Sequence, residues 1–487
     1  MPILVKERIG NERDALLKQH QGSSKAYLPE GNYKPGERLS FPALDWQKAR
    51  VLNVRPGVNP GVGEFDVIEV EFEDGSKKQF AARLADHKLN QASDISLGDD
   101  SFDPEKIIDM HGEELEIAIA KSLRADHNLV QIAGRWFPRA LLLDVNAGHL
   151  NLAEAVLDEA AGKPLPTEAL IEQVALPSGS NQKLLEFSMN FALQEDGRFD
   201  EVGPAGEVLW CLKRLEPTDI QQIPVPLRFV NISYDRSMLT EEMLALEAAI
   251  DDELGEGEAP AQNITELTIS LTYPHWRAGT LPVAARTRKL FPTAYESERV
   301  RFTLVDAQSK EEMPAWVARR HGYVAGLKNF YQKYGLIPGS LVTLRLAQKA
   351  GQVIIEARTR RPTRDWVRTV LVGSDGGIVF ANLKQNLTTE FNERMVIAVP
   401  DPSGVDAACE QIAKQRAPFE KLVANMMQEL TKLNVQGHVH AQELYSALNI
   451  IRRCPPGPLL AHLTQSSEYR HVGDLHFRLA EREAADE

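Results

Sequence analysis

Four arginines bracket Pro362 at the end of a strand-like run: Arg358, Arg360, Arg361 and Arg364. A guanidinium group is planar and always charged, and its paired N–H donors match phosphate oxygens and the edge of guanine. In an extended strand Arg358 and Arg360 share one face, so their guanidinium groups point the same way. The cluster therefore predicts contacts with nucleic acid.

Positive charge is concentrated in one stretch of an otherwise acidic chain. The 487 residues carry a formal net charge of −14, but residues 283–370 hold seventeen Lys or Arg and seven Asp or Glu, which is +10 locally and leaves −24 elsewhere. The other basic candidates in this stretch are Arg319, Arg320, His321, Lys328 and Lys333. Such segregation is typical of a nucleic-acid footprint. The alternative is a β domain whose edge arginines deter strand pairing.

Sequence motifs for catalysis or metal binding are not found. The chain has no H-E-x-x-H, G-x-S-x-G or P-loop motif and no H-x-K phosphodiesterase motif. His438 and His440 form a close pair, which we interpret as cap and surface residues at the start of a helix. The cysteines, Cys211, Cys409 and Cys454, lie far apart, which argues against a disulfide framework and a zinc site. We expect a protein that is not an enzyme and has no cofactor.

The hydropathy pattern predicts a multidomain α+β protein. The first residues lack the apolar run of a signal peptide, and no run approaches the ~18 residues of a membrane span, so we expect a cytoplasmic protein. The expected order is an N-terminal arm (1–35), a small β-barrel (36–90), an acidic linker with strand and helix (91–150), a winged helix (151–215), an extended acidic linker (216–262), a basic β pseudobarrel with following strands (263–400), and a second winged helix (405–480).

Two distant segments repeat one pattern after helical sequence. RFDEVGPAGEVLWCL spans residues 198–212, and EYRHVGDLHFRL spans residues 468–479. Each pairs an aromatic strand with a Val-Gly turn and a second aromatic strand. Three helices followed by a two-stranded wing is the winged helix-turn-helix order, in which the third helix normally enters the major groove. We expect Phe199, Trp210, Tyr469 and Phe477 to pack each wing onto its helices.

With KPLPTEALIEQV as its second helix, residues 151–215 resemble the HARE-type winged helix. This type is found in the delta subunit of bacterial RNA polymerase and attached to some restriction enzymes, and residues 418–480 look like a diverged second copy. The first copy would offer Asn181, Gln182 and Lys183 to DNA, and the second would offer Arg452, Arg453, Arg470 and His471. The alternatives are protein binding for the first copy and surface charges for the second. As helix caps we expect Asn151, Thr167, and either Ser180 or Asn181.

The basic middle resembles a second family. Residues 314–346 hold a tryptophan strand (Trp316), a helix beginning near Gly326, and an apolar strand after Gly339. This pattern is similar to the DNA-binding pseudobarrel of plant auxin-response factors and of some restriction-enzyme recognition domains. In the N-terminal part, VEFEDGSKKQF (70–80) resembles small Tudor-like or SH3-like barrels, with a turn expected at Asp74-Gly75.

These observations predict a non-enzymatic protein that binds double-stranded DNA, in transcription regulation or chromosome organisation. One alternative is an adaptor that binds RNA polymerase or chromatin proteins, motivated by the acidic remainder of the chain. A second alternative is the recognition subunit of a restriction or defence system whose nuclease is another chain.

Overall fold

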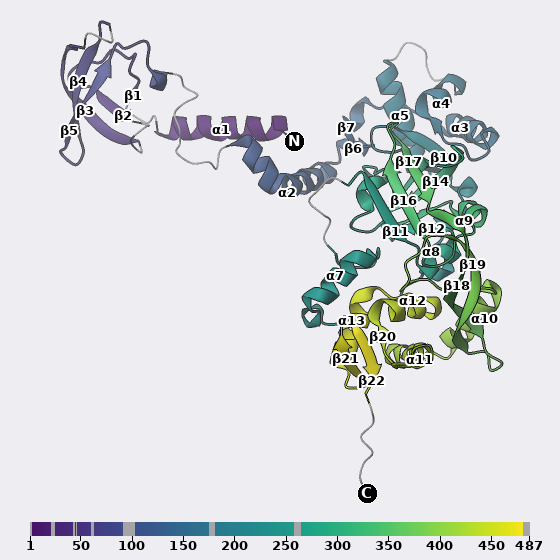
Figure 1. Ribbon diagram of the computed structural model, residues 1–487. Helices are drawn as coiled ribbons and strands as arrows, with labels where there is room; N and C mark the ends of the chain where they lie inside the picture. Colours follow the sequence, from purple (N-terminus) through teal and green to yellow (C-terminus); the bar gives the residue numbers. More distant parts are fainter. Residues whose placement is uncertain are drawn as a thin grey trace. The chain divides into compact units, whose positions relative to one another are not determined.

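The computed structural model describes residues 2–20, 25–41, 44, 46–59, 63–90, 103–174, 181–257 and 264–480 (Figure 1). The chain forms two compact units, Met1–His127 and Asn128–Glu487, which are described separately below. Both helices and several sheets are present, as the sequence predicts for an α+β protein.

The N-terminal unit is built on a five-stranded sheet with its strands in chain order. The strands are β1 (Lys25–Ala26), β2 (Arg38–Phe41), β3 (Gln47–Pro56), β4 (Asp66–Phe72) and β5 (Lys77–Ala82). The predicted turn at Asp74-Gly75 is confirmed, because Asp74 accepts a hydrogen bond from the Ser76 N–H at 2.8 Å and Gly75 has φ +81°. The described residues of this unit also form α1 (Pro2–His20), α2 (Pro104–Ala125) and the 3-10 turn η2 (Lys88–Asn90).

The second unit begins with the hairpin β6 (Leu129–Ile132) and β7 (Arg135–Pro138) and the turn η5 (Arg139–Leu141). The first module, residues 146–215, follows. Its elements are α3 (Ala147–Glu159), β8 (Leu165–Pro166), α4 (Thr167–Gln173), α5 (Gln182–Glu195), β9 (Phe199–Glu201), β10 (Leu209–Leu212) and η6 (Lys213–Leu215). The strands pair in the order β8-β10-β9.

Helix starts in the first module differ in part from the expected caps. Asn181 does cap α5, accepting from the Lys183 N–H at 2.9 Å, whereas Ser180 lies outside the described residues. Asn151 does not cap α3, because Asn146 forms a capping box with His149 one turn earlier. The Thr167 hydroxyl makes no cap either, since it donates to the buried Asn190 side chain at 2.6 Å.

A seven-stranded, strongly curled half-barrel forms the centre of the second unit. Its strand order is β11-β16-β17-β13-β14-β15-β12. The strands are β11 (Glu266–Ser270), β12 (Thr280–Pro282), β13 (Arg299–Asp306), β14 (Glu312–Ala318), β15 (Tyr323–Ala325), β16 (Leu341–Leu346) and β17 (Gln352–Ala357). Helices and turns at its ends are α8 (Tyr273–Ala278), η9 (Arg288–Leu290), η10 (Arg319–His321) and α9 (Lys328–Tyr334). Helix α9 begins two residues after Gly326, close to the predicted start, and residues 323–325 before it pair as strand β15.

After the half-barrel, two long strands pair with each other as an antiparallel ribbon. They are β18 (Thr359–Val372) and β19 (Ile378–Thr389). The second module follows, with α10 (Pro402–Lys414) before it. Its elements are α11 (Phe419–Thr431), β20 (Val439–His440), α12 (Ala441–Ile451), α13 (Pro456–Gln465), β21 (Tyr469–Gly473) and β22 (His476–Leu479).

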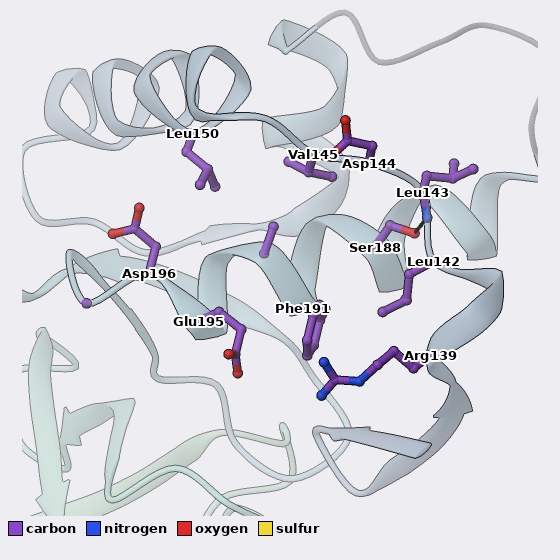
Figure 2. A pocket seen from close by; sticks show the side chains of 12 residues that line it. Arg139, Leu142, Leu143, Asp144, Val145, Leu150, Ser188, Phe191, Glu195 and Asp196 are labelled. Carbon is purple, nitrogen blue, oxygen red and sulfur yellow. Dashed lines mark hydrogen bonds between the residues drawn. The ribbon is translucent and has the colours of Figure 1, made fainter. Parts of the chain in front are cut away.

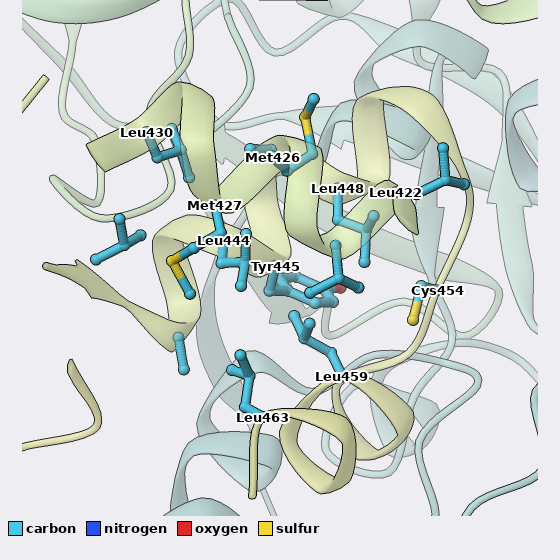
Figure 3. Packing of buried hydrophobic residues seen from close by; sticks show 14 of the residues in the cluster. Leu422, Met426, Met427, Leu430, Leu444, Tyr445, Leu448, Cys454, Leu459 and Leu463 are labelled. Carbon is cyan, nitrogen blue, oxygen red and sulfur yellow. The ribbon is translucent and has the colours of Figure 1, made fainter. Parts of the chain in front are cut away.

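The two modules share one order of elements: helix, strand, helix, helix, strand, strand. Their sheets also agree, because β20-β22-β21 repeats the order β8-β10-β9. As expected, Phe199 and Trp210 are buried in the core of the first module, and Tyr469 and Phe477 in that of the second. Figure 3 shows the core of the second module, where Leu444 and Leu448 of α12 meet Met427 of α11 and Leu459 of α13.

The predicted acidic linker is instead part of the folded unit. Residues 216–257 form α6 (Thr218–Gln221), η7 (Val225–Leu227), η8 (Arg236–Met238), α7 (Glu241–Ile250) and an acidic turn that follows α7. Leu239 and Met243 are buried in the same core as α12 and α13. Residues 258–262 of the predicted linker lie outside the described residues.

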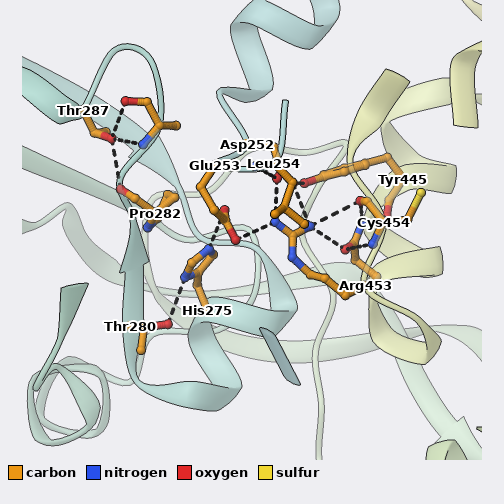
Figure 4. A network of polar contacts seen from close by, with 12 residues as sticks. Asp252, Glu253, Leu254, His275, Thr280, Pro282, Thr287, Tyr445, Arg453 and Cys454 are labelled. Atoms are coloured by element: carbon orange, nitrogen blue, oxygen red, sulfur yellow. Dashed lines mark hydrogen bonds and ion pairs between the residues drawn. The ribbon is translucent and has the colours of Figure 1, made fainter. Parts of the chain in front are cut away.

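Figure 4 shows a buried network of charged and polar groups that joins this acidic turn to two distant segments. Arg453 contacts Asp252 at 2.5 Å and Glu253 at 2.7 Å, and the side chains of all three are almost completely buried. Glu253 also contacts His275 Nε2 at 2.9 Å, and Tyr445 donates to Asp252. Burial alone would raise the pKa of Glu253, but Arg453 and His275 outweigh it and hold that pKa well below its usual range.

Within the described ranges, no helix is both long and apolar enough to cross a membrane.

Candidate nucleic-acid interface

The ribbon β18–β19 presents one polar face built from directly paired residues. Arg364 pairs with Asn386, and Trp366 pairs with Lys384, so these four side chains lie on the same side. All four are exposed, and the Trp366 side chain is 66 % exposed. The Lys384 ammonium group lies 5.1 Å from the centre of the Trp366 ring. We call Arg364, Trp366, Lys384 and Asn386 the ribbon face.

The chemistry of the ribbon face suits a nucleic-acid groove. Arg and Lys can neutralise phosphates, and the amide of Asn386 can donate to and accept from a base edge. A large exposed tryptophan offers apolar surface that water solvates poorly. A two-stranded ribbon is also narrow enough to enter a major groove.

A bulge carries two of the predicted arginines. On β18, Thr359 and Thr363 are four positions apart. Their partners on β19, Thr389 and Leu387, are only two positions apart. The extra residues are in the stretch Arg360-Arg361-Pro362, where proline cannot donate to the ladder. Arg361 and Arg364 are exposed, and no ion pair joins either of them to an acid in the described part of the chain. These two guanidinium groups are therefore available to a ligand.

The other two predicted arginines of this cluster are engaged within the protein. Arg358 contacts Glu390 at 3.1 Å. Arg360 is paired with Asp365, and its guanidinium group lies 4.6 Å from the centre of the Phe391 ring. Both are partly exposed, but each contact with a phosphate would have to compete with a carboxylate already in place.

A groove of about 750 Å³ separates the ribbon from the second module. Trp366, Arg368 and Asn382 line one side, and the loop after α11, including Asn434 and Val435, lines the other. Arg368 crosses between the two, since it contacts Glu443 of α12 at 2.8 Å. The ribbon and the second module therefore form one continuous surface.

In the half-barrel the predicted basic residues are scattered. Lys333 is held by Asp306 at 2.8 Å and by Glu311 at 2.9 Å, so its charge is already paired within the protein. Lys328 is exposed at the start of α9. The three residues of η10, Arg319, Arg320 and His321, are exposed at the rim of a separate cavity. Burial is the main cause that lowers the pKa of His321, and the charge of Arg320 adds to it.

In the first module the third helix is largely covered by the preceding hairpin. Phe137 stacks on Phe187 of α5 with 4.6 Å between ring centres, and the Arg139 guanidinium lies 5.3 Å from the Phe191 ring centre. Figure 2 shows the cavity that remains, with Phe191, Leu142 and Leu150 directed toward it. Gln182 and Lys183 are exposed at the start of α5, but Asn181 is engaged as its cap.

The base of the first module's wing is docked on the half-barrel. Val202 is buried against Trp316, and its carbonyl accepts from the Arg301 N–H at 2.8 Å. Arg299 contacts Glu216 at 2.7 Å, and Ser297 donates to Glu201. The base of this wing contacts protein, and its exposed tip, Ala205-Gly206-Glu207, carries an acid and no base.

In the second module the third helix is again covered, but the wing is exposed. Its wing is exposed at Arg470 and His471, whereas every residue of α13 from Pro456 to Leu463, apart from the half-buried His462, is buried. The segment 232–250 covers α13, with Leu239 and Met243 in the shared core. Arg452 is half-buried with its guanidinium 5.9 Å from the Phe419 ring centre. The prediction that Arg453 contacts DNA is corrected by the structure. Its side chain is 1 % exposed and bound by Asp252 and Glu253, so it cannot reach DNA.

Three histidines of the second module, His438, His440 and His476, lie close together. His440 caps α12 in a capping box with Glu443, as the sequence suggests, but it is buried and not a surface residue. Its ring and that of His438 lie near His476, at 5.0 and 4.8 Å between ring centres. In the part of the chain that the structure describes, no group of three or more His, Cys, Asp or Glu side chains is arranged to hold a metal ion.

Sequence reasoning missed Trp366, Lys384 and Asn386. A signal was present, because alternation along residues 364–368 places Arg364, Trp366 and Arg368 on one strand face. The partner strand could not be aligned from sequence, since the bulge shifts the register.

Neither a protein-family model, nor a curated protein, nor a solved structure matches this chain.

Proposed function

We propose that this protein is a non-enzymatic double-stranded DNA-binding protein whose main contact is the ribbon face together with Arg361. The observation that carries the proposal is the exposed set of Arg361, Arg364, Lys384 and Trp366 on the two-stranded ribbon. The ribbon (residues 358–389) holds six Lys or Arg and two Asp, in a chain whose net charge is −14.

The repeated modules support this proposal. Helix, strand, helix, helix, strand, strand with the third strand in the middle of the sheet is the order expected of a winged helix, and it occurs twice. We propose that the exposed second wing, with Arg470 and His471, supplies a backbone contact beside the ribbon. The first module, whose wing is docked on the half-barrel, takes a scaffolding role in this proposal. The proposed roles are transcription regulation or chromosome organisation in the cytoplasm.

The test is binding to a fluorescent random-sequence duplex, followed by anisotropy across a salt series. The test variant is Arg361→Glu/Arg364→Glu. Its matched control is Lys310→Glu/Lys349→Glu, which changes the net charge equally at two exposed lysines in loops of the half-barrel. Each phosphate contact contributes about 0.9 to the slope of log affinity against log salt. We expect the ribbon variant to lose roughly two such contacts and the control to keep the slope of the wild type.

Equal losses in both variants would mean that only overall charge matters, and the ribbon would not be the interface. If the wild type fails to bind duplex at low salt, DNA binding itself is wrong. The modules would then be examined as protein-binding domains, by recovery of RNA polymerase subunits or chromatin proteins from lysate.

A further inference from the structure

A second concave site lies in the same unit and is not part of the ribbon interface. It is a cavity of about 590 Å³ between the half-barrel and the segment 216–257. Its inner wall is apolar, with Leu227, Phe229, Phe291 and Val317. Cavities of this size and character hold small organic molecules.

The rim of the cavity is basic. Arg288 stands on η9, and Arg319, Arg320 and His321 form η10. Arg288 and Arg320 are exposed, and neither is ion-paired with an acid among the residues that the structure describes. Arg319 donates to the Ser297 carbonyl at 2.7 Å, which fixes the direction of its side chain. Two guanidinium groups are therefore free to bind a ligand at one opening.

The cavity lining contains one acid, Glu253, and both of its oxygens are already engaged within the protein. One carboxylate oxygen contacts Arg453 at 2.7 Å and the other contacts His275 at 2.9 Å (Figure 4). Because both oxygens are engaged within the protein, Glu253 does not pair with the rim arginines. The rim charges are thus not balanced from inside the cavity.

We propose that this cavity binds a small organic anion, with its phosphate or carboxylate head on Arg288 and Arg320 and its apolar body against Phe229 and Phe291. Charge and shape both support this ligand. A concave, partly apolar wall concentrates the field of the rim arginines and strengthens their hydrogen bonds to an anion. A duplex presents a convex charged backbone and has nothing apolar to fill the inner wall. The proposal is independent of DNA binding by the ribbon.

The test uses isothermal titration calorimetry of the full chain. Each of two organic anions is compared with a small anion that carries the same charged group alone. AMP is compared with inorganic phosphate, and decanoate is compared with acetate. We expect at least one of AMP and decanoate to bind about tenfold more tightly than its head alone, because only the organic ligand fills the apolar wall. The variant Arg288→Gln/Arg320→Gln should weaken that binding at least tenfold, since each lost charge-assisted hydrogen bond costs about a factor of ten.

Two controls separate this site from general charge and from misfolding. Lys310→Gln/Lys349→Gln removes two exposed charges from loops outside the cavity lining and should leave binding unchanged. The thermal unfolding curve of each variant checks the fold, and the single variant Arg320→Gln replaces the double one if the double one fails to fold.

Several outcomes would overturn the proposal. In one, neither AMP nor decanoate binds at about millimolar concentration. In another, both organic ligands bind no more tightly than their heads, so that the apolar wall plays no part. A third is equal binding in the wild type and the arginine variant. If the arginine variant instead loses duplex binding while no small anion binds, the rim is a DNA contact and the cavity is not a ligand site.

Discussion

The guanidinium group of Arg453 forms a bidentate ion pair with the carboxylate of Asp252, 201 positions earlier, with distances of 2.5 and 2.7 Å. This pair closes the acidic turn that follows α7 onto the second module. It also fixes the chain that covers α13, because Asp252 closely follows the segment 232–250 that packs on this helix. A ligand therefore cannot contact the covered side of α13.

Replacing Arg453 by Met should destabilise the protein by about 3–5 kcal/mol, because Asp252 would keep a buried charge without its partner. The matched control is Arg452→Met, which loses only a contact over the Phe419 ring, about 0.5–1 kcal/mol. Denaturant unfolding followed by tryptophan fluorescence measures both. Similar losses for the two variants would contradict a structural role for the pair.

Trp366→Ala should weaken duplex binding about tenfold and leave the salt slope unchanged. The side chain contributes apolar contact, worth about 1.5 kcal/mol when buried, and carries no charge that neutralises a phosphate. Trp366→Phe, which keeps a ring, should retain most of the affinity. Because the tryptophan is 66 % exposed, thermal unfolding should hardly change in either variant. A slope that falls with Trp366→Ala would show that the ribbon itself had been distorted.

The docked first wing should make stability depend on pH. Burial raises the pKa of Glu201 from its ordinary value of 4.5 to about 7, although Ser297 and the Gly203 N–H donate to its carboxylate. Between these values the folded state holds a proton that the unfolded state has lost, so stability falls as pH rises from about 4.5 to about 7. Glu201→Gln removes this titration. The free energy of unfolding of the variant minus that of the wild type should therefore be larger at pH 8 than at pH 4.5. A difference that is constant with pH would contradict the assignment.

Gly339→Ala should be strongly destabilising because of a close backbone approach. Gly339 has φ +91°, and a Cβ there would lie 2.4 Å from Val396 Cα. Gly351→Ala is the matched control, since its φ of +72° is similar but a Cβ would meet nothing within 4 Å. The control should lose about 1–2 kcal/mol from the left-handed conformation alone. The Gly339 variant should lose clearly more in the same denaturant titration, and equal losses would show that the backbone at Val396 adjusts.

Much of the fold could be predicted from sequence where the signals are local. Alternating apolar residues predicted the strands of the half-barrel, and the Asp74-Gly75 turn follows from turn chemistry. The repeat of helical sequence followed by two aromatic strands led to both modules. Asn181 was recognised as a cap because its side chain acts within its own helix.

Predictions that depend on distant partners were less successful. Arg453 stands beside Arg452 in a locally basic stretch, and nothing near it reveals Asp252. The stretch 216–262 is predicted as a linker because of its acidic composition, and composition cannot show that Asp252 and Glu253 contact Arg453 and that Glu253 also contacts His275. For α13, the prediction of a helix that reads DNA did not take account of the nearly all-apolar PGPLLAHL, a composition typical of a helix buried on all sides.

The bulge in β18 also limits how this strand can change in length. Side chains alternate between faces with a period of two, so removal of Arg361 and Pro362 together would restore a regular ladder and keep Trp366 opposite Lys384 on the same side. Removal of only one of them would leave an odd spacing, so Thr359 would turn to the opposite side relative to the face that carries both Trp366 and Val370. Insertions and deletions in this strand should therefore be tolerated only in even numbers, and a shortened ribbon would keep its face while losing one positive charge.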